Sequence, residues 1–250
     1  MRYLFSPAAL SELHRFIAGS TLFAFDLDGT LTPIVSDPGG IMIHAEVNHC
    51  LTELDRLAPV AIITGRSSAD ARGHLGFTPR FLVGNHGAEG LPGVRGDCGN
   101  HVALVQGWID QLHQLVPGMR EMGIVIEDKG ASVTLHYRHA ADPEKADGLL
   151  LEAISSLNPI PRRVGGKFVE NLVPQGAHNK GSALLSLMSH LSCRRAIFVG
   201  DDVTDEDVFR LDNPDVLGIC VEKRAGSAAR YYLKGQYEVI RLLREIVNQL

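Results

Sequence analysis

The sequence predicts an α/β protein with two domains: a Rossmann-like core built on a parallel sheet, and a smaller α+β domain inserted into it. Short apolar runs alternate with helical stretches at both ends of the chain, which indicates a parallel sheet with helices on both faces. Between residues 92 and 174 the order changes to helix, hairpin, helix, hairpin, typical of an antiparallel sheet covered on one side. We therefore predict a core of residues 1–91 and 175–250 and an inserted domain of residues 92–174.

The first half of the core opens with a helix over residues 6–18, whose apolar side chains fall on one stripe. The strands that follow are apolar runs too short for helices, and each ends in polar or turn-forming residues. In chain order we expect a strand over 22–25, a helix over 46–57, a strand over 60–64, a helix over 69–75 and a strand over 81–83.

The inserted domain combines two helices, over residues 101–115 and 143–157, with two hairpins. The first hairpin turns at Gly130, and its second strand alternates apolar and polar residues. The second is expected to turn at Gly165-Gly166. The core then resumes, with a helix over 180–192, a strand over 196–200, a helix over 205–211, a strand over 216–221 and a helix over 237–250.

Composition excludes several classes of partner. The chain has 250 residues, 45% of them hydrophobic, and a net charge of -5 without any lysine or arginine run, so we expect no nucleic-acid partner. No apolar run approaches the roughly 20 residues that span a membrane. The amino terminus is amphipathic rather than a signal peptide, and the four cysteines lack paired spacing. We therefore expect reduced thiols and a cytoplasmic location.

Polar signatures follow the strands of the predicted parallel sheet. In such sheets ligands bind at the carboxyl ends of the strands. Strand alternation sends Asp26 and Asp28 to one side, where two close carboxylates repel each other unless a cation joins them. The signatures are Asp26/Asp28, Thr64-Gly65-Arg66, Lys180 and Asp201/Asp202.

Each signature alone has an ordinary explanation as a turn, a helix cap or a solvated lysine. Together they favour a site for Mg²⁺ and a phosphoryl group. Asp26 and Asp201 offer carboxylates from different strands, which suit a hard cation. Lys180 and the Thr64 hydroxyl can neutralise phosphoryl charge. A metal-bound aspartate can also serve as a nucleophile.

The motifs resemble those of haloacid-dehalogenase-like (HAD) phosphohydrolases. Residues 26–30, Asp-Leu-Asp-Gly-Thr, are similar to the family signature, and Thr64, Lys180 and residues 200–202 match its second, third and fourth motifs in order. The inserted domain resembles the α/β cap of the sugar-phosphatase branch. Longer strings resemble the trehalose-6-phosphate phosphatase family, namely residues 64–66, 84–87, 127–129, 170–171 and 200–206.

The resemblance implies a Mg²⁺-dependent phosphoric monoester hydrolase that converts trehalose 6-phosphate to trehalose and phosphate, the last step of trehalose biosynthesis. Asp26 would be the nucleophile that forms an aspartyl-phosphate, and Asp28 the general acid and base. Thr64 and Lys180 would hold phosphoryl oxygens. The implied Mg²⁺ ligands are Asp26, the backbone carbonyl of Asp28, Asp201 and, as a weaker or outer ligand, Asp202.

Sugar recognition is expected mainly of the cap. A disaccharide offers only hydroxyls, so its site needs paired donors and acceptors. Glu127, Lys129 and Glu170 supply these, although a solvated hairpin would also carry such charges. From the core we expect Arg66, Asn85 and His86 to bind substrate. The family also implies functional coupling to a trehalose-phosphate synthase.

Two other functions stay open. Another HAD-type sugar-phosphate phosphatase or a phosphomutase would keep the core and change the substrate, and a mutase would release no net phosphate. A phosphorylation-dependent switch is the second, because receiver domains also group aspartates, a threonine and a lysine on a parallel sheet. Receiver domains lack an inserted cap, and a switch would keep a stable aspartyl-phosphate.

Overall fold

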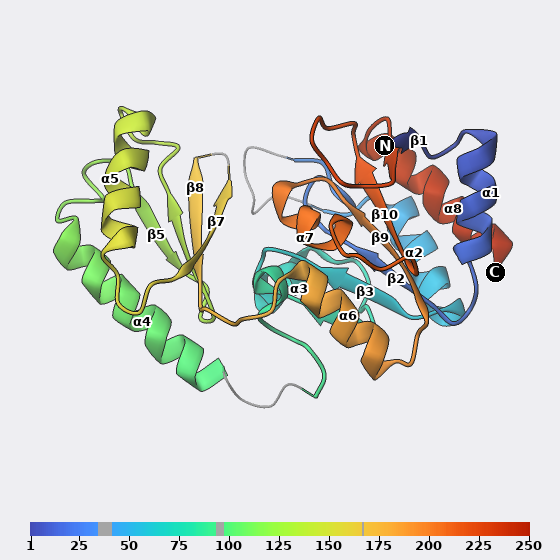
Figure 1. The fold of residues 1–250 in the computed structure, drawn as a ribbon, viewed down its shortest axis with the longest axis horizontal. Coiled ribbons are helices and arrows are strands. Elements are labelled where there is room, and N and C mark those ends of the chain that lie inside the picture. Colours follow the sequence, from blue (N-terminus) through green and yellow to red (C-terminus); the bar gives the residue numbers. More distant parts are fainter. Residues whose placement is uncertain (35–41, 94–97, 167) are drawn as a thin grey trace. The chain divides into compact units, whose positions relative to one another are not determined.

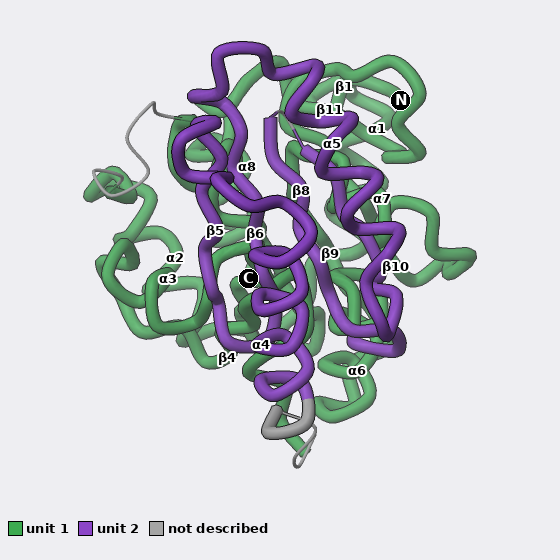
Figure 2. The backbone as a smooth tube through the Cα atoms, turned by 90° about the vertical axis from the view of Figure 1, so that its left-hand side faces the viewer, with its two compact units in different colours: residues 1–93, 178–250 green, residues 94–177 purple. Residues whose placement is uncertain are grey.

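A computed structural model describes residues 1–34, 42–93, 98–166 and 168–250 (Figure 1). The chain forms two compact units, one of residues 1–93 and 178–250 and one of residues 94–177 (Figure 2). The sequence placed the boundaries at 91/92 and 174/175. The first unit holds a seven-stranded sheet and the second a four-stranded sheet, so each has its own backbone pairing and its own core.

The sheet of the first unit is parallel throughout, which confirms the predicted fold class. Its central strand is β2, which pairs with β9 on one side and β3 on the other. The two strands β1 and β11 were not predicted, because two or three residues carry too little local pattern. Across the sheet the order is β1 (Arg2–Tyr3), β11 (Tyr231–Leu233), β10 (Val216–Val221), β9 (Arg195–Gly200), β2 (Thr21–Phe25), β3 (Val60–Ile63) and β4 (Phe81–Val83).

Both faces of this sheet are covered by helices. Phe23 and Phe25 of β2 point into one apolar core, and Leu22 and Ala24 point into the other, as strand alternation requires. The first core is closed by α1 (Pro7–Phe16), α2 (Ala45–Leu57), α3 (Ser68–His74) and α8 (Val239–Gln249). The second is closed by α6 (Lys180–His190) and α7 (Glu206–Phe209). Short 3₁₀ turns complete the unit: η2 (Asn85–Gly87), η3 (Val203–Asp205) and η4 (Gln236–Glu238).

The second unit is the predicted α+β layer. Its antiparallel sheet has the order β5 (Val125–Asp128), β6 (Val133–His136), β8 (Val169–Val173) and β7 (Arg162–Gly166). Its helices are α4 (Cys98–Leu115) and α5 (Pro143–Ser155). The core lies on one face of the sheet, where Val133, Leu135 and Leu172 pack with Trp108 and Leu150 from the helices.

The turn of the first hairpin lies where the sequence predicted it, and the turn of the second does not. Gly130 adopts a φ of 75°, a left-handed conformation that favours glycine, between β5 and β6. The turn expected at Gly165-Gly166 was misplaced, because both glycines are paired residues of β7. Phe168, with a φ of 61°, follows them, and Lys167 lies outside the described residues.

No helix within the described ranges is both long and apolar enough to cross a membrane. Three cysteines with described side chains, Cys50, Cys193 and Cys220, are buried free thiols. Burial raises the pKa of each thiol. A raised thiol pKa lowers the thiolate fraction at neutral pH, so these cysteines are poor nucleophiles.

Glu12 of α1 joins that helix to the edge strands, and this contact carries a testable pH dependence. Its carboxylate accepts hydrogen bonds from the Tyr231 hydroxyl, from Arg230, and from Arg2 at 3.2 Å. These partners, Tyr231 first, hold the pKa of Glu12 below its usual value although partial burial opposes them. A lowered folded-state pKa adds stability above the unfolded pKa, and that stability is lost as the pH falls through the folded pKa.

We expect Glu12→Gln to lower the free energy of unfolding at pH 7 by about 1 kcal/mol, with the difference from wild type shrinking toward zero below pH 4. Urea denaturation at pH 7 and pH 3.5 measures this. Glu53→Gln is the matched control in α2, where the half-exposed carboxylate lies 3.7 Å from His49 Nε2, and should change stability little at either pH. An equal loss at both pH values would contradict the ionic contribution of Glu12.

Candidate active site

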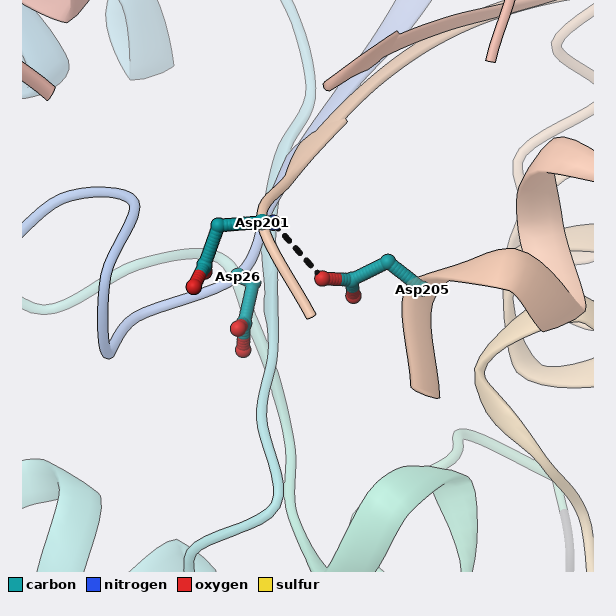
Figure 3. Close-up of side chains that lie close together, drawn as sticks. All are labelled: Asp26, Asp201 and Asp205. Carbon is teal, nitrogen blue, oxygen red and sulfur yellow. Dashed lines mark hydrogen bonds between the residues drawn. The ribbon is translucent and has the colours of Figure 1, made fainter. Parts of the chain in front are cut away.

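Three aspartate side chains converge at the carboxyl end of the parallel sheet. Figure 3 shows Asp26, Asp201 and Asp205 close together, with the Asp205 side chain reaching toward the Asp201 backbone. Each offers an oxygen within 4.8 Å of the others. Asp26 follows β2 and Asp201 follows the neighbouring strand β9, while Asp205 ends the η3 turn. This cluster, Asp26, Asp201 and Asp205, is called the acidic cluster below.

Local backbone geometry explains how the acidic cluster forms. The Asp26 N–H donates to the Val199 carbonyl at 2.9 Å, which continues the pairing of β2 with β9 by one residue. Since Leu22 and Ala24 face the α6 side, alternation turns Asp26 to that side as well. Asp205 Oδ2 accepts the N–H groups of Asp201 and Asp202, each at 2.8 Å, and closes the turn after β9.

Two glycines make room for these carboxylates. A Cβ on Gly29, whose φ is 80°, would lie 2.1 Å from Asp201 Oδ2. A Cβ on Gly200 would lie 2.3 Å from Asp205 Cγ. Any larger residue at either position would therefore push a carboxylate out of the acidic cluster, which explains glycine directly after Asp28 and directly before Asp201.

Lys180 brings a positive charge to the acidic cluster. It is the first residue of α6, whose N-terminus is capped by Asn179 and Ser182. Its Nζ lies 3.0 Å from Asp26 Oδ1 and 2.7 Å from Asp205 Oδ1, and only 1% of the residue is exposed. Burial acts to lower the Lys180 pKa, but the charges of Asp205 and Asp26 outweigh it and raise the pKa. Lys180 is therefore a buried ammonium group.

One ammonium group does not balance three carboxylates. Burial raises the pKa of Asp26, Lys180 opposes this, and Asp205 and Asp201 raise it further, so that the pKa ends well above its usual range. Burial and the Asp205 charge raise the Asp201 pKa to about 7, although a hydrogen bond from Thr30 at 2.9 Å opposes them. A cluster of carboxylate oxygens with too little positive charge nearby suits a hard divalent cation such as Mg²⁺.

Asp28 lies outside the acidic cluster and is held by Arg66. Arg66 donates two hydrogen bonds to the Asp28 carboxylate, from Nε and Nη2, each 2.7 Å long, and a third from Nη1 to Asp70 at 2.7 Å. Burial acts to lower the Arg66 pKa, but Asp28 and Asp70 outweigh it and raise the pKa. Arg66, predicted to bind substrate, is thus placed to orient Asp28, since a bidentate pair fixes a carboxylate in its plane.

Thr64 lies at the end of β3, beside β2, and is fully buried. Its N–H donates to Val83 at 2.9 Å and its hydroxyl oxygen accepts the Arg66 N–H at 3.2 Å. Because a hydroxyl can accept and donate at once, this leaves its proton for a ligand oxygen. The structure therefore places Thr64 on the strand next to the one that carries Asp26.

Asn85 and His86 form the loop after β4 and both have positive φ angles, 49° and 57°. Asn85 is fully buried, and its side-chain amide donates to Glu89 at 3.0 Å. The His86 N–H donates to the Thr64 carbonyl at 2.9 Å, and its ring lies against Gly65. Asn85 thus makes an internal hydrogen bond and His86 lies beside the Thr64-Gly65-Arg66 loop, and their contacts with substrate stay predictions.

The predicted Mg²⁺ ligands Asp26 and Asp201 belong to the acidic cluster, whereas the side chains of Asp28 and Asp202 lie outside it. The Asp202 side chain is 56% exposed and outside the cluster, with Oδ1 3.9 Å from Arg224 Nη1. Asp205 takes its place, although the sequence indicated only the start of a helix there. The missed signal was the three-residue spacing from Asp202 to Asp205, because that spacing suits a side chain that caps the turn.

The predicted residues of the second unit divide between the two faces of its sheet. Glu127 pairs in register with Thr134, whereas Glu170 pairs with Leu135, which faces the apolar core. Paired residues share a face, so Glu170 points toward the helices, where it binds Arg163 at 3.1 Å through both oxygens. The structure does not bring Glu170 together with Glu127.

Glu127 instead lies beside two basic side chains on the other face of the sheet. Its Oε2 lies 2.8 Å from His136 Nε2 and 3.7 Å from Lys129 Nζ. About half of the Glu127 side chain is exposed. Thr134 donates to Asn171 at 2.7 Å on the same face. This polar face, Glu127, Lys129, Thr134, His136 and Asn171, carries the hydrogen-bonding groups predicted for the hairpin.

Comparisons of this chain with a family model, curated sequences and solved structures agree on one family. The trehalose-phosphatase family model matches residues 24–238. An uncharacterized glycosyl hydrolase of Mycobacterium tuberculosis is 31% identical over 267 residues, which cover 96% of this chain and 19% of that protein. A trehalose-phosphate phosphatase of Mycobacterium marinum is 30% identical over 90% of this chain and 61% of its own length. The chain thus spans less than two thirds of both relatives.

Solved structures agree with the sequence comparisons. A trehalose-6-phosphate phosphatase of Aspergillus fumigatus matches all of this chain and all of that chain, with a TM-score of 0.69 and 26% identity. The family match covers both segments of the core and the unit between them. The chain therefore belongs to the trehalose-phosphatase family of HAD-like proteins, as its motifs predicted.

Proposed function

We propose that this protein is a Mg²⁺-dependent phosphatase that hydrolyses trehalose 6-phosphate to trehalose and phosphate. The observation that carries the proposal is the buried Lys180 beside Asp26 and the acidic cluster, in a chain of the trehalose-phosphatase family. Buried carboxylates with an adjacent ammonium group suit phosphoryl transfer, which depends mainly on positioning and charge stabilisation.

In the proposed reaction an Asp26 oxygen attacks phosphorus while the bond to the sugar oxygen breaks. Asp28 gives its proton to the departing sugar oxygen, so trehalose leaves as a neutral alcohol and Asp26 carries the phosphoryl group. Asp28 then takes a proton from water as that water attacks phosphorus, which releases phosphate and restores Asp26. Arg66 would orient Asp28 through its bidentate pair, and one of these two hydrogen bonds would open for Asp28 to take up the proton that it delivers to the sugar oxygen.

Other residues would bind charge rather than exchange protons. Lys180 and the Thr64 hydroxyl would hold phosphoryl oxygens in both steps. Asp26, Asp201 and Asp205 would hold Mg²⁺, with the carbonyl of Asp28 as a further proposed ligand. The cation would supply positive charge for the phosphoryl oxygens. Asp202, exposed and outside the acidic cluster, would act at most indirectly.

The second unit is proposed as the cap that selects the sugar. Its polar face carries hydrogen-bond acceptors and donors, which sugar hydroxyls require. Glu127 is central to that face, because it holds His136 and Lys129 together. Glu170 would contribute only indirectly, through its pair with Arg163.

We expect Glu127→Ala to raise KM for trehalose 6-phosphate about tenfold, because one charged hydrogen-bond acceptor is lost. The kcat for an aryl phosphate, which has no sugar to recognise, should not change. Steady-state kinetics on both substrates measure this, with Glu121→Ala as the exposed control in the same unit. An equal loss on both substrates would argue against sugar recognition by Glu127.

The decisive experiment is a phosphate-release panel with and without EDTA. Trehalose 6-phosphate, sucrose 6-phosphate, glucose 6-phosphate and an aryl phosphate are compared at equal concentration. We expect the highest kcat/KM for trehalose 6-phosphate and no release in EDTA. Preference for another sugar phosphate would favour a different phosphatase, and phosphate retained as a stable aspartyl-phosphate would favour a switch.

A phosphomutase would be recognised in the same panel by sugar-phosphate isomers formed without net phosphate release.

A cytoplasmic location and functional coupling to a trehalose-phosphate synthase complete the proposal. The family supports both only indirectly, through the role of a biosynthetic enzyme. Sedimentation of this protein mixed with a synthase would test physical association.

A further inference from the structure

Arg224 lies in the loop after β10 and contacts Asp201, the residue that follows β9. It lies three residues beyond β10, which pairs with β9 on the side away from β2. Its Nη2 donates to the backbone carbonyl of Asp201 at 2.6 Å. We propose that Arg224 is a positioning residue that fixes Asp201 for a divalent cation. This inference rests on the proposed function, because it concerns how a proposed metal ligand is held.

The contact completes the restraints on Asp201. The peptide that joins Asp201 to Asp202 is held at its carbonyl by Arg224 and at its N–H by Asp205, at 2.8 Å. The preceding peptide is held by the bond from the Asp201 N–H to Asp205. With both peptide planes fixed, the Cα–Cβ direction of Asp201 is fixed too, and the Thr30 hydroxyl donates to its carboxylate at 2.9 Å. Groups that orient ligands in this way affect metal affinity without touching the metal.

The chain adopts an unfavourable conformation just before Arg224. Glu222, one residue after β10, is exposed and has a φ of 66°, a region that favours glycine. Its N–H donates to the Leu233 carbonyl at 3.0 Å, which holds this bend against β11. The bend is consistent with a loop shaped to bring Arg224 to Asp201 rather than to maximise stability.

A role through charge alone predicts the opposite effect. Arg224 also lies near Asp202, with Nη1 3.9 Å from Oδ1, so it adds positive charge beside the acidic cluster. Positive charge repels Mg²⁺, so its removal would tighten cation binding if charge dominated. Loss of positioning would weaken binding instead. The direction of the change in Mg²⁺ affinity therefore separates the two roles.

The test is calorimetric titration of Mg²⁺ alone into protein stripped of metal with EDTA and dialysed. Arg224→Met should raise the Mg²⁺ Kd about tenfold, the lower end of the range for groups that orient metal ligands. Arg224→Lys keeps the positive charge and can still donate a hydrogen bond, so its Mg²⁺ Kd should increase less. Lys223→Ala is the matched control, because its Nζ lies over the Tyr232 ring, and its Kd should equal that of wild type.

An unchanged or lower Kd in Arg224→Met would overturn the proposal. Thermal unfolding in EDTA checks that each variant is folded, and Arg224→Gln, which keeps a neutral donor, replaces the Met variant if that protein is unfolded. The titration uses no substrate. Wild-type protein that binds Mg²⁺ but releases no phosphate from trehalose 6-phosphate would contradict the proposed function alone. Wild-type protein that does not bind Mg²⁺ would overturn both.

Discussion

Asp26→Asn is expected to reduce phosphate release from trehalose 6-phosphate by at least about a thousandfold, because an amide cannot replace the carboxylate nucleophile. The fold should persist, since asparagine has nearly the same shape. Lys180 also keeps a partner in the variant, because its Nζ lies 2.7 Å from Asp205. Phosphate release under saturating Mg²⁺, with far-UV circular dichroism as the check on folding, measures the prediction.

Asp212→Asn is the matched control for this change, because Asp212 is exposed and lies outside the acidic cluster. It removes one carboxylate in the same way and should leave kcat and KM unchanged. Residual activity in Asp26→Asn above a few per cent would sink the assignment of the nucleophile. Trapping of radiolabelled phosphate on wild-type protein but not on the variant would support it directly.

Lys180→Met is expected to affect both activity and stability. Removal of the ammonium group leaves Asp26 and Asp205 buried without their cation. Breaking a buried ion pair in this way costs about 3 kcal/mol. In EDTA the free energy of unfolding should fall by about that amount, and with Mg²⁺ the loss should be smaller, because a bound cation replaces part of the missing charge. Phosphate release should fall at least about a hundredfold.

Urea denaturation with EDTA and with saturating Mg²⁺ measures the stability effect. Lys145→Met, at an exposed position near the start of α5, provides the control and should be neutral in both conditions. The idea fails if Lys180→Met is as stable as wild type in EDTA. A loss that is the same with and without Mg²⁺ would show that packing, rather than charge, explains the effect of Lys180.

Much of the fold follows from local sequence pattern. The runs that became β2, β3, β9 and β10 are apolar and too short for helices, and their neighbours are amphipathic or apolar helices. Their order predicts a parallel sheet because each helix must cross a face to reach the next strand. The strands β1 and β11 escape this reasoning, since they are only two and three residues long and exist through pairing with each other and with β10.

The parts of the site that the sequence did not reveal have a related cause. Asp205 was predicted only as the start of a helix, because its contacts, with Lys180 and with the Asp201 and Asp202 amides, depend on how the turn closes. Glu170 was predicted to bind the sugar as a charged residue of the cap, and that stays a prediction. Alternation places it on the face of Leu172, but only packing against Trp108 and its neighbours decides that this face is the covered one.

By itself the sequence determined the parallel sheet, the inserted α+β unit and the family, together with Asp26, Thr64, Lys180 and Asp201 as candidates at the strand ends. Those predictions depend on periodicity and on motifs that are local in the chain. Only the tertiary structure decided which groups meet: Arg66 with the Asp28 carboxylate, Asp205 with Lys180, and Arg224 with the Asp201 carbonyl. These pairs join residues 23 to 38 positions apart, and only the packing of neighbouring strands and loops brings such distant groups within hydrogen-bonding distance.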